Sequence, residues 1–298
     1  MPRFQVLSDA QWLLIAELLP RPTGKPGRKF SDARTMIEGI VYRYRTGIAW
    51  RDLPEVYGPW QTVWTWHRRL ADDGTWDRIH AELIAAADAA GLIDWSSSVD
   101  STIARARQHA TNTTRLTGGP GSNYKNPGVE PPEHAVGRSR GGLSTKIQHL
   151  VDGHGRSQVT LLTPGQAGDS LMLLPSLNKL RVARASGRPR TQPEALRGDK
   201  AYSSQAIRAH LRSRGIKAVI PEPEDRKGHR RRRGSRGGRP VGLDAADYKN
   251  RKVIERSYCH LKQWRAIATR YDKHAVAYRA AIILLSFITR TKALSDTP

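Results

Sequence analysis

The chain has 298 residues, and its 50 Lys and Arg against 27 Asp and Glu give a formal net charge of +23. A single cysteine, Cys259, excludes a disulfide framework and a cysteine-rich zinc module. The longest apolar run, over residues 280–288, is too short to span a bilayer, and the first residues lack the pattern of a signal peptide, so we expect a cytoplasmic protein. The length favours about two domains, and the charge favours nucleic acid over a merely solvated basic surface.

The N-terminal part of the chain has helical patterns only. Ser8 or Asp9 is a suitable N-cap for an amphipathic helix over residues 11–19, and several prolines then break the chain. Ser31 or Asp32 is a suitable N-cap for a second helix, which carries apolar residues at helical spacing and stops at Gly47.

A third helix is predicted from Pro59 to Leu70, after the break at Gly58-Pro59, and its end is basic. Two helices joined by a turn that contains glycine are typical of a helix-turn-helix, whose second helix enters the major groove of DNA. Five of the eight tryptophans lie between residues 50 and 76, and we assign most of them to a small helical core. With a fourth helix over 76–90, they complete a helical domain predicted for residues 1–92. The candidate DNA-facing residues are Gln61, Thr62, Thr65 and Arg68.

From residue 93 onward, strand patterns alternate with helical ones, which predicts a second domain over 93–298 with a mixed sheet and helices on both faces. Residues 152–155 (DGHG) predict the turn of a hairpin. A basic loop within 221–243, densest at 226–240, cannot pack into a core and is predicted to be disordered. A second long loop is expected over 118–142. Strands are expected to end at Asp100 and to cover 143–151, 156–162, 195–199 and 216–220. Helices are expected over 171–182, 203–214 and, with a break near Tyr271, 244–291, and Asp169 or Ser170 is a suitable N-cap for the first of them.

Two acidic residues, Asp100 and Asp199, close predicted strands in a chain where acids are scarce. A carboxylate at the end of a strand projects into the crevice where the chain turns, and two on neighbouring strands could share divalent cations. Hard oxygen ligands suit Mg²⁺ or Mn²⁺, and no His or Cys cluster competes for another metal. The alternative for each acid is that it caps the helix or turn that follows.

The predicted C-terminal helix carries Tyr248, Arg251, Glu255 and Lys262 within about 60° of one another, at 100° per residue. Ile254, Tyr258 and Leu261 form an adjacent apolar face that can dock on the sheet. An ordinary surface ion pair at positions i and i+4 explains Arg251 with Glu255, but it does not explain Tyr248 or Lys262.

The spacing Y-x2-R-x3-E-x6-K resembles the signature of bacterial insertion-sequence transposases of the DDE type, in the insertion-sequence 5 branch of the insertion-sequence 4/5 superfamily. The segments VDSTIARARQHA and RGDKAYSS are similar to that family's first and second acidic motifs, and GRSRGGLSTKIQHLVDGHG resembles its intervening hairpin. The N-terminal segment GIAWRDLPEVYGPWQTVWTWHRR is similar to the helical domain that precedes the catalytic core. The resemblance covers roughly residues 5 to 290.

This resemblance implies a ribonuclease-H-like catalytic domain in which Asp100, Asp199 and Glu255 hold a pair of Mg²⁺ ions. Two such metals activate a water and stabilise the leaving oxygen, so one site can free a 3′-OH at the element's end and then join it to target DNA. Joining two ends requires a dimer or larger assembly on double-stranded DNA. Two departures are the Ala201 where the family often has Gly, and a basic loop where some relatives carry a large β-rich insertion.

Two basic residues of the helical signature are expected to contact DNA phosphates. We assign Arg251 and Lys262 to phosphates beside the scissile bond and Tyr248 to a hydroxyl contact or stacking near the end. The alternative for Arg251 is that it only pairs with Glu255 and orients it. A cluster over Arg230, Arg231, Arg232 and Arg233 is expected to act as a sequence-blind clamp. Two alternatives stay open: a metal-dependent nuclease without strand transfer, and a DNA-binding regulator that uses the N-terminal domain alone.

Overall fold

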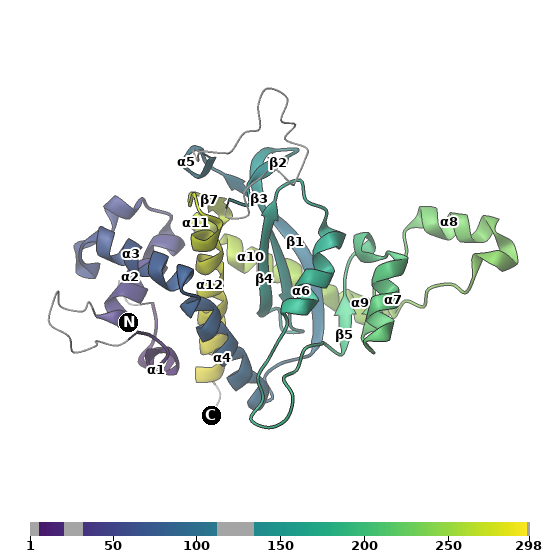
Figure 1. The fold of residues 1–298 in the computed structure, drawn as a ribbon, viewed down its shortest axis with the longest axis horizontal. Helices are drawn as coiled ribbons and strands as arrows, with labels where there is room; N and C mark the ends of the chain where they lie inside the picture. Colours follow the sequence, from purple (N-terminus) through teal and green to yellow (C-terminus); the bar gives the residue numbers. More distant parts are fainter. Residues whose placement is uncertain (1–5, 21–31, 112–133, 297–298) are drawn as a thin grey trace.

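A group of N-terminal helices, a central mixed sheet and a set of C-terminal helices make up the computed structural model, which describes residues 6–20, 32–111 and 134–296. The long C-terminal helix α12 (Ala275–Ser295) stands between the N-terminal helices and the sheet (Figure 1). Among these described residues, no helix is both long and apolar enough to cross a bilayer.

The N-terminal helices begin where the sequence supplies a cap. The Ser8 hydroxyl accepts from the Gln11 amide in a capping box, and the Asp32 carboxylate accepts from the Thr35 amide. The second helix ends at Gly47, whose φ of 75° is the left-handed conformation that glycine adopts freely. Ser31, the other predicted cap, lies outside the described residues. The helices are α1 (Asp9–Ala16), α2 (Ala33–Thr46), α3 (Trp60–Asp72) and α4 (Thr75–Ala89), with 3₁₀ turns η1 (Trp50–Asp52) and η2 (Glu55–Tyr57) before α3.

The central sheet has the strand order β2-β3-β1-β5-β6, with β4 beside β3 and β7 beside β1. The β1–β3 and β3–β4 pairs are antiparallel, whereas β1–β5 and β5–β6 are parallel. Its faces are covered by α6 (Leu173–Lys179) and α7 (Gln205–Ser213) on one side and by α10 (Lys252–Lys262) and α12 on the other, which confirms the predicted mixed sheet with helices on both faces. The strands are β1 (Ser96–Ala106), β2 (Gly137–Ser139), β3 (Gly142–Val151), β4 (Ser157–Pro164), β5 (Ala195–Arg197), β6 (Lys217–Val219) and β7 (Thr269–Arg270).

Strand β1 is longer than its sequence pattern indicates. The prediction that it ends at Asp100 is wrong, because antiparallel pairing with β3 continues as far as Arg105. On its other edge, β1 pairs with β5 only up to Ser98 and with β7 from Arg105. Asp100 therefore lies on a stretch of β1 that is paired on one edge and open on the other among the described strands.

Two predicted boundaries around the sheet are also wrong. The loop expected over 118–142 falls mainly outside the described residues, but Gly137–Ser139 pairs with β3 as strand β2. The helix expected over 171–182 is a 3₁₀ turn, η4 (Asp169–Met172), followed by α6 (Leu173–Lys179). It stops early because Val182 is extended and bridges to Arg190. Beyond β5, η5 (Lys200–Tyr202) and α7 (Gln205–Ser213) lead to β6.

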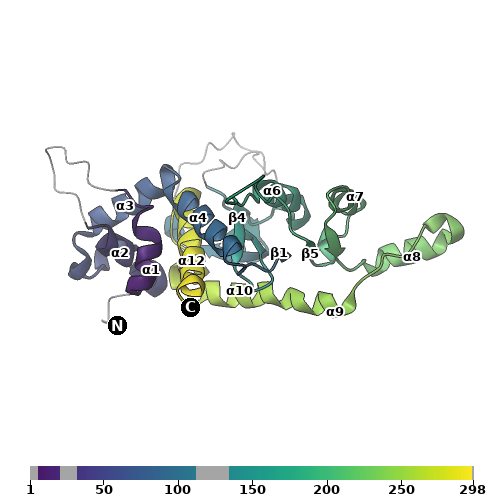
Figure 2. The same cartoon turned by 90° about the horizontal axis from the view of Figure 1, so that it is seen from below.

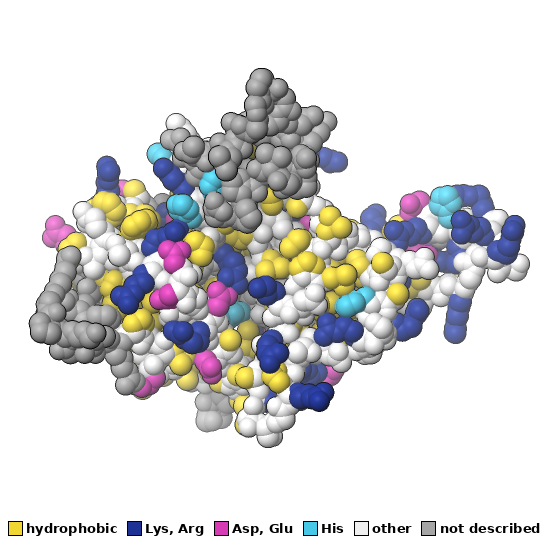
Figure 3. Space-filling model, viewed as in Figure 1, with side chains coloured by type: hydrophobic (Ala, Val, Ile, Leu, Met, Phe, Trp, Pro, Cys, Tyr) yellow, Lys and Arg dark blue, Asp and Glu magenta, His cyan; other side chains and the backbone are white. Residues whose placement is uncertain are grey.

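The basic segment is a helix, and the prediction of a disordered loop is wrong. Helix α8 (Glu224–Arg232) is followed by the 3₁₀ turn η6 (Gly234–Gly237), and none of their residues is buried. Glu224 and Asp225 lie in the first turn and the arginines in the last, where each charge is favourable to the helix dipole. Together α8 and η6 form an arm that projects from the body in both ribbon views (Figures 1 and 2) and is crowded with Lys and Arg side chains (Figure 3).

The C-terminal helical region is divided more often than predicted. It comprises α9 (Ala245–Tyr248), the 3₁₀ turn η7 (Lys249–Arg251), α10 (Lys252–Lys262), α11 (Arg265–Ala268) and α12. The chain is extended at Trp264 and again at Thr269 and Arg270, which form β7, so the break begins before Tyr271. From α9 to α10 the helical run extends beneath the sheet (Figure 2).

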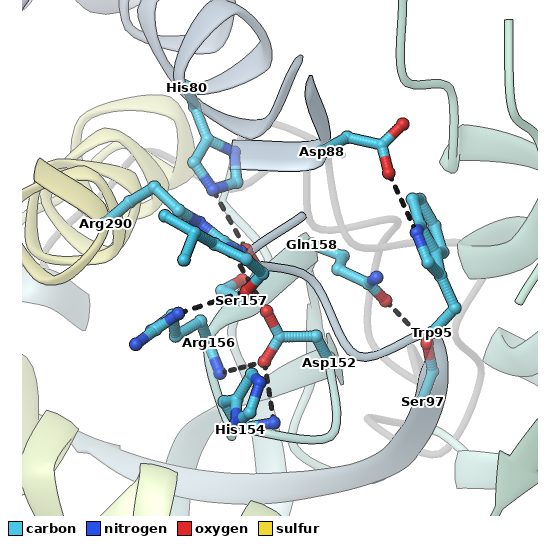
Figure 4. A network of polar contacts seen from close by, with 11 residues as sticks. His80, Asp88, Trp95, Ser97, Asp152, His154, Arg156, Ser157, Gln158 and Arg290 are labelled. Carbon is cyan, nitrogen blue, oxygen red and sulfur yellow. Dashed lines mark hydrogen bonds and ion pairs between the residues drawn. The ribbon is translucent and has the colours of Figure 1, made fainter. Parts of the chain in front are cut away.

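A buried ion pair fixes α12 to the β3–β4 hairpin. Arg290 donates to Asp152 at 2.9 Å, and both side chains are fully buried. The other Asp152 oxygen accepts from the amides of His154 and Arg156, so this one carboxylate organises the turn (Figure 4). Since α12 also packs against α1, α3 and α4, the hydrophobic core is continuous from the N-terminal helices to the sheet. The boundary at residue 92 stays a prediction.

Candidate active site

Asp100 and Asp199 meet at one edge of the sheet because β1 and β5 run parallel. Ser98 and Arg197 are paired in register, and each acid lies two residues beyond its member of that pair. The Asp199 side chain accepts from the Ala201 amide at 2.9 Å and so caps η5, as the capping alternative proposed. Asp100 caps no helix; it accepts from the amide of Ser101, its neighbour in the strand, at 2.8 Å.

Arg251 connects Asp100 to Glu255. Its Nη2 atom lies 3.0 Å from Asp100 Oδ2, and its Nη1 atom donates to the Glu255 carboxylate one turn along the helix. The Arg251 and Asp100 side chains are 17% and 22% exposed, whereas Glu255 is 49% exposed. An ion pair between Arg251 and Glu255 alone therefore does not describe the arrangement, because Arg251 also donates to Asp100 on β1.

The surroundings of Asp100 favour the neutral form of its carboxyl group. Burial raises the pKa of the Asp100 carboxyl, and the nearby negative charges of Asp199 and Glu255 raise it further. The Ser101 amide and the Arg251 guanidinium lower the same pKa, but the net direction is upward from 3.8. The three acids are thus electrostatically coupled, and a cation between them would relieve their repulsion.

Several polar side chains beside Asp100 were missed by the sequence reasoning. Asp169 was predicted as a helix cap, but it accepts instead from Lys146 at 2.8 Å, Ser101 at 2.7 Å and Gln148 at 3.3 Å. These hydrogen bonds lower the pKa of Asp169 despite its partial burial. A signal was present: Lys146 and Gln148 alternate along β3, and Gln148 pairs in register with Ser101.

Two tyrosines surround the same position. Tyr258, predicted on the apolar face of its helix, is buried there and donates its hydroxyl to the carbonyl oxygen of Asp100 at 2.7 Å. This hydrogen bond satisfies a backbone carbonyl on the edge of β1 that pairs with no described strand at this position. The Tyr202 hydroxyl is buried and has no hydrogen-bond partner within the described chain, and the acids that raise its pKa, after burial, include Asp100 and Asp199.

Comparison with known proteins places the chain in a family. A family model described as "Transposase DDE domain" matches residues 95–289, and one described as "Putative transposase of IS4/5 family" matches residues 7–80. The chain belongs to the IS4/5 family of DDE transposases. It is accordingly a DNA-processing enzyme, and the DDE domain match contains all three predicted acids.

Two of three bacterial relatives of this transposase carry the name of an insertion element, IS402. The "Insertion element IS402 uncharacterized 16.2 kDa protein" of Burkholderia cepacia is 41% identical over 34% of this chain and 74% of its own length. "Uncharacterized protein y4sN" of Sinorhizobium fredii is 36% identical over 38% of this chain and 86% of its own. The "Putative transposase for insertion sequence element IS402" of Burkholderia cepacia is 30% identical over 46% of this chain, which spans 58% of that protein. No solved structure matches.

DDE transposase domains use divalent metal ions, and the donors here fit such an ion. Within the described ranges, no three His, Cys, Asp or Glu side chains are grouped closely enough to hold a metal. The chemistry nevertheless suits a hard cation: Asp100, Asp199 and Glu255 supply carboxylate oxygens whose mutual repulsion a cation would relieve. The unpartnered hydroxyl of Tyr202 is a further group that a ligand at this site would satisfy.

The other members of the helical signature are not brought to the acids. Tyr248 is half-buried at the end of α9 and Lys262 is exposed at the end of α10. Neither side chain makes a hydrogen bond or ion pair to Asp100, Asp199 or Glu255, and each lies seven residues, about 10 Å along the axis, from Glu255. Their assignment to DNA stays a prediction.

The helix-turn-helix is not confirmed. Helices α2 and α3 pack together, but residues 47–59 between them hold η1 and η2 and are longer than the turn of that motif. Of the predicted contact residues on α3, Gln61 and Thr65 are exposed, whereas Thr62 and Arg68 are half-buried. Arg68 also pairs with Asp72 at 3.0 Å.

The predicted basic clamp is divided between paired and free cations. Arg230 forms an ion pair with Glu222, and its side chain is 18% exposed. Arg231, Arg232 and Arg233 are exposed, at the end of α8, and form no ion pair with any described residue. These three are consequently the members of the cluster that are available to a partner.

Proposed function

We propose that this transposase binds the terminal inverted repeats of its insertion sequence, cleaves the DNA ends and joins the 3′-OH ends to target DNA. The observation that carries the proposal is that Arg251 donates to both Asp100 and Glu255, while Asp199 follows β5, the parallel neighbour of the strand that holds Asp100. The strand order, with three antiparallel strands followed by two parallel ones, supports the assignment of the sheet as ribonuclease-H-like.

A pair of Mg²⁺ ions held by Asp100, Asp199 and Glu255 would supply an activated water or 3′-OH and stabilise the leaving oxygen. The chain's own residues prepare the site. Arg251 keeps two of the carboxylates close and offsets their repulsion, and Tyr258 fixes the backbone of Asp100. No covalent enzyme intermediate is needed, since the same carboxylates serve cleavage and joining.

The remaining parts of the chain would hold the DNA. We propose that residues 1–92 select the element ends through α3, and that the exposed arginines of the α8 arm bind phosphates without regard to sequence. Two DNA ends joined at one target require two active sites, so we propose that a dimer or larger assembly forms on the DNA. A protein with these substrates would work at the bacterial nucleoid.

The proposal is tested by strand-specific nicking of a labelled duplex that carries an element end. Asp100→Asn, Asp199→Asn and Glu255→Gln should each abolish Mg²⁺-dependent cleavage, because each replaces a charged oxygen ligand by a neutral group of nearly the same size. End binding should remain largely intact. Cleavage retained by any one variant would remove that residue from the site.

A further inference from the structure

A cavity of about 440 Å³ lies on the side of α10 that faces away from Glu255. Its walls come from α10, α12 and the β3–β4 turn, and Trp264, Leu285 and Ile288 give it an apolar part. At 100° per residue, Arg256 and His260 point 100° and 140° away from Glu255 around the helix. We call it the rear pocket, and it is separate from the acids.

Positive charge converges on the rear pocket from three helices. Arg45 at the end of α2, Arg256 on α10 and Lys292 on α12 line it, and Arg156 on the turn also lines it but donates to the carbonyl oxygen of Leu92. None of the described residues that line it is acidic, and Arg45, Arg256 and Lys292 form no ion pair with a described carboxylate. Elsewhere the chain neutralises such residues, as in the Arg290–Asp152 pair. The three cations without such a bond repel one another across the cavity unless an anion is present.

A buried histidine with no partner lies in the wall of the rear pocket. His149 is 2% exposed, and neither ring nitrogen has a hydrogen-bond partner within the described chain. A neutral imidazole always carries one N–H, and leaving a buried donor unpaired is costly. An anion with acceptor oxygens in the pocket would satisfy it. The ring stacks on Tyr258 at a centroid distance of 5.6 Å, and Tyr258 in turn holds the Asp100 carbonyl, so the pocket adjoins the catalytic strand.

We infer that the rear pocket binds a backbone phosphate of the DNA on which the transposase acts, at a second position beyond the acids. A helix with its side chains is about 10–12 Å across, so the width of α10 separates this phosphate from the phosphate at the acids. The apolar wall suits the sugar beside it. This inference rests on the proposed function.

The test measures how the affinity of the full-length chain for a short labelled duplex depends on salt. The pocket variant is Arg256→Gln with Lys292→Gln, and both side chains are exposed, so the fold should persist. The matched control is Arg181→Gln with Arg188→Gln, two exposed cations outside the pocket that form no ion pair with any described residue. The pocket variant should flatten the slope of log K against log salt by about 0.9 for each phosphate that is no longer neutralised, and the control should not.

Further arms separate the possible sources of the effect. Arg256→Lys with Lys292→Arg keeps the charge and should keep the wild-type slope. Equal slopes for the pocket variant and the control would overturn the inference. If, in addition, orthophosphate stabilises the wild type but not the pocket variant, the pocket binds free phosphate and not DNA. A wild-type chain that binds no duplex would overturn the proposed function as well, whereas equal slopes with normal cleavage would overturn the pocket alone.

Discussion

The bonds of Arg251 to Asp100 and Glu255 favour a role in positioning the acids over the phosphate contact predicted from the sequence. In Arg251→Met the bond to Asp100 is removed, together with the bond to the more exposed Glu255. A partly buried charge-assisted hydrogen bond contributes about 1.5–3 kcal/mol, whereas an exposed pair contributes about 0–1 kcal/mol, so the Asp100 bond dominates. At about 1.4 kcal/mol for a factor of ten, removal of this positioning should raise the Mg²⁺ concentration for half-maximal cleavage roughly tenfold to a hundredfold.

The assay is a Mg²⁺ titration of nicking on a labelled element end, with binding of the same end measured in parallel. Lys262→Ala is the matched control, because Lys262 lies on the same helical stripe but makes no ion pair to the acids. It should weaken binding of the cleaved end and reduce joining while the Mg²⁺ midpoint stays near that of the wild type. A lower midpoint in Arg251→Met would mean that the guanidinium competes with the cation, and an unchanged midpoint with weaker DNA binding would mean a phosphate contact; either result refutes the positioning role.

Three other predictions concern the α8 arm, helix α3 and the buried ion pair. Replacing the exposed arginines at the end of α8, Arg231, Arg232 and Arg233, by Gln should weaken binding to all duplexes alike and flatten the salt slope by up to about 0.9 for each phosphate they neutralise; an unchanged slope in the binding assay would show that they only solvate the arm. Substituting Gln61 and Thr65 on α3 by Ala should reduce the preference for element ends over random DNA, measured by competition, and a preserved preference would exclude α3 as the reading helix. Arg290→Met should lower the free energy of unfolding by about 3–5 kcal/mol in denaturant titrations, because it leaves Asp152 buried without its cation, and a decrease under about 1 kcal/mol would contradict that account.

Helix caps and tight turns are the parts of the fold that the sequence predicted correctly. Asp32 and Gly47 bound α2, and the DGHG turn joins β3 to β4, because caps and tight turns are decided by a few neighbouring residues. Asp100 and Asp199 were found from predicted strand ends, and Glu255 was found through the spacing Y-x2-R-x3-E-x6-K and its family resemblance. The position of Asp199 relative to Asp100 depends on the parallel pairing of β1 with β5, which the sequence does not display.

The predictions that were wrong involve long-range contacts or charge. Strand β1 extends past Asp100 because β3 pairs with it, from Ser101 with Gln148 to Arg105 with Ser144, a contact between segments distant in the sequence. Asp169 was predicted to cap a helix, but Lys146 and Ser101 hold it at the sheet. Helix α8 was missed because its mean hydropathy is very low, whereas its acidic start and basic end suit the helix dipole.

The most direct test of the central claim is joining of a pre-cleaved end. A labelled duplex with an exposed 3′-OH at the element end is incubated with a target plasmid, Mg²⁺ and the full-length chain, and the label that enters the plasmid is measured. The account predicts joined products with the wild type and none with Asp100→Asn, Asp199→Asn or Glu255→Gln. Cleavage of intact ends without any joining by the wild type would contradict it and would indicate a nuclease, and joining retained by one of the three variants would contradict the single acidic site.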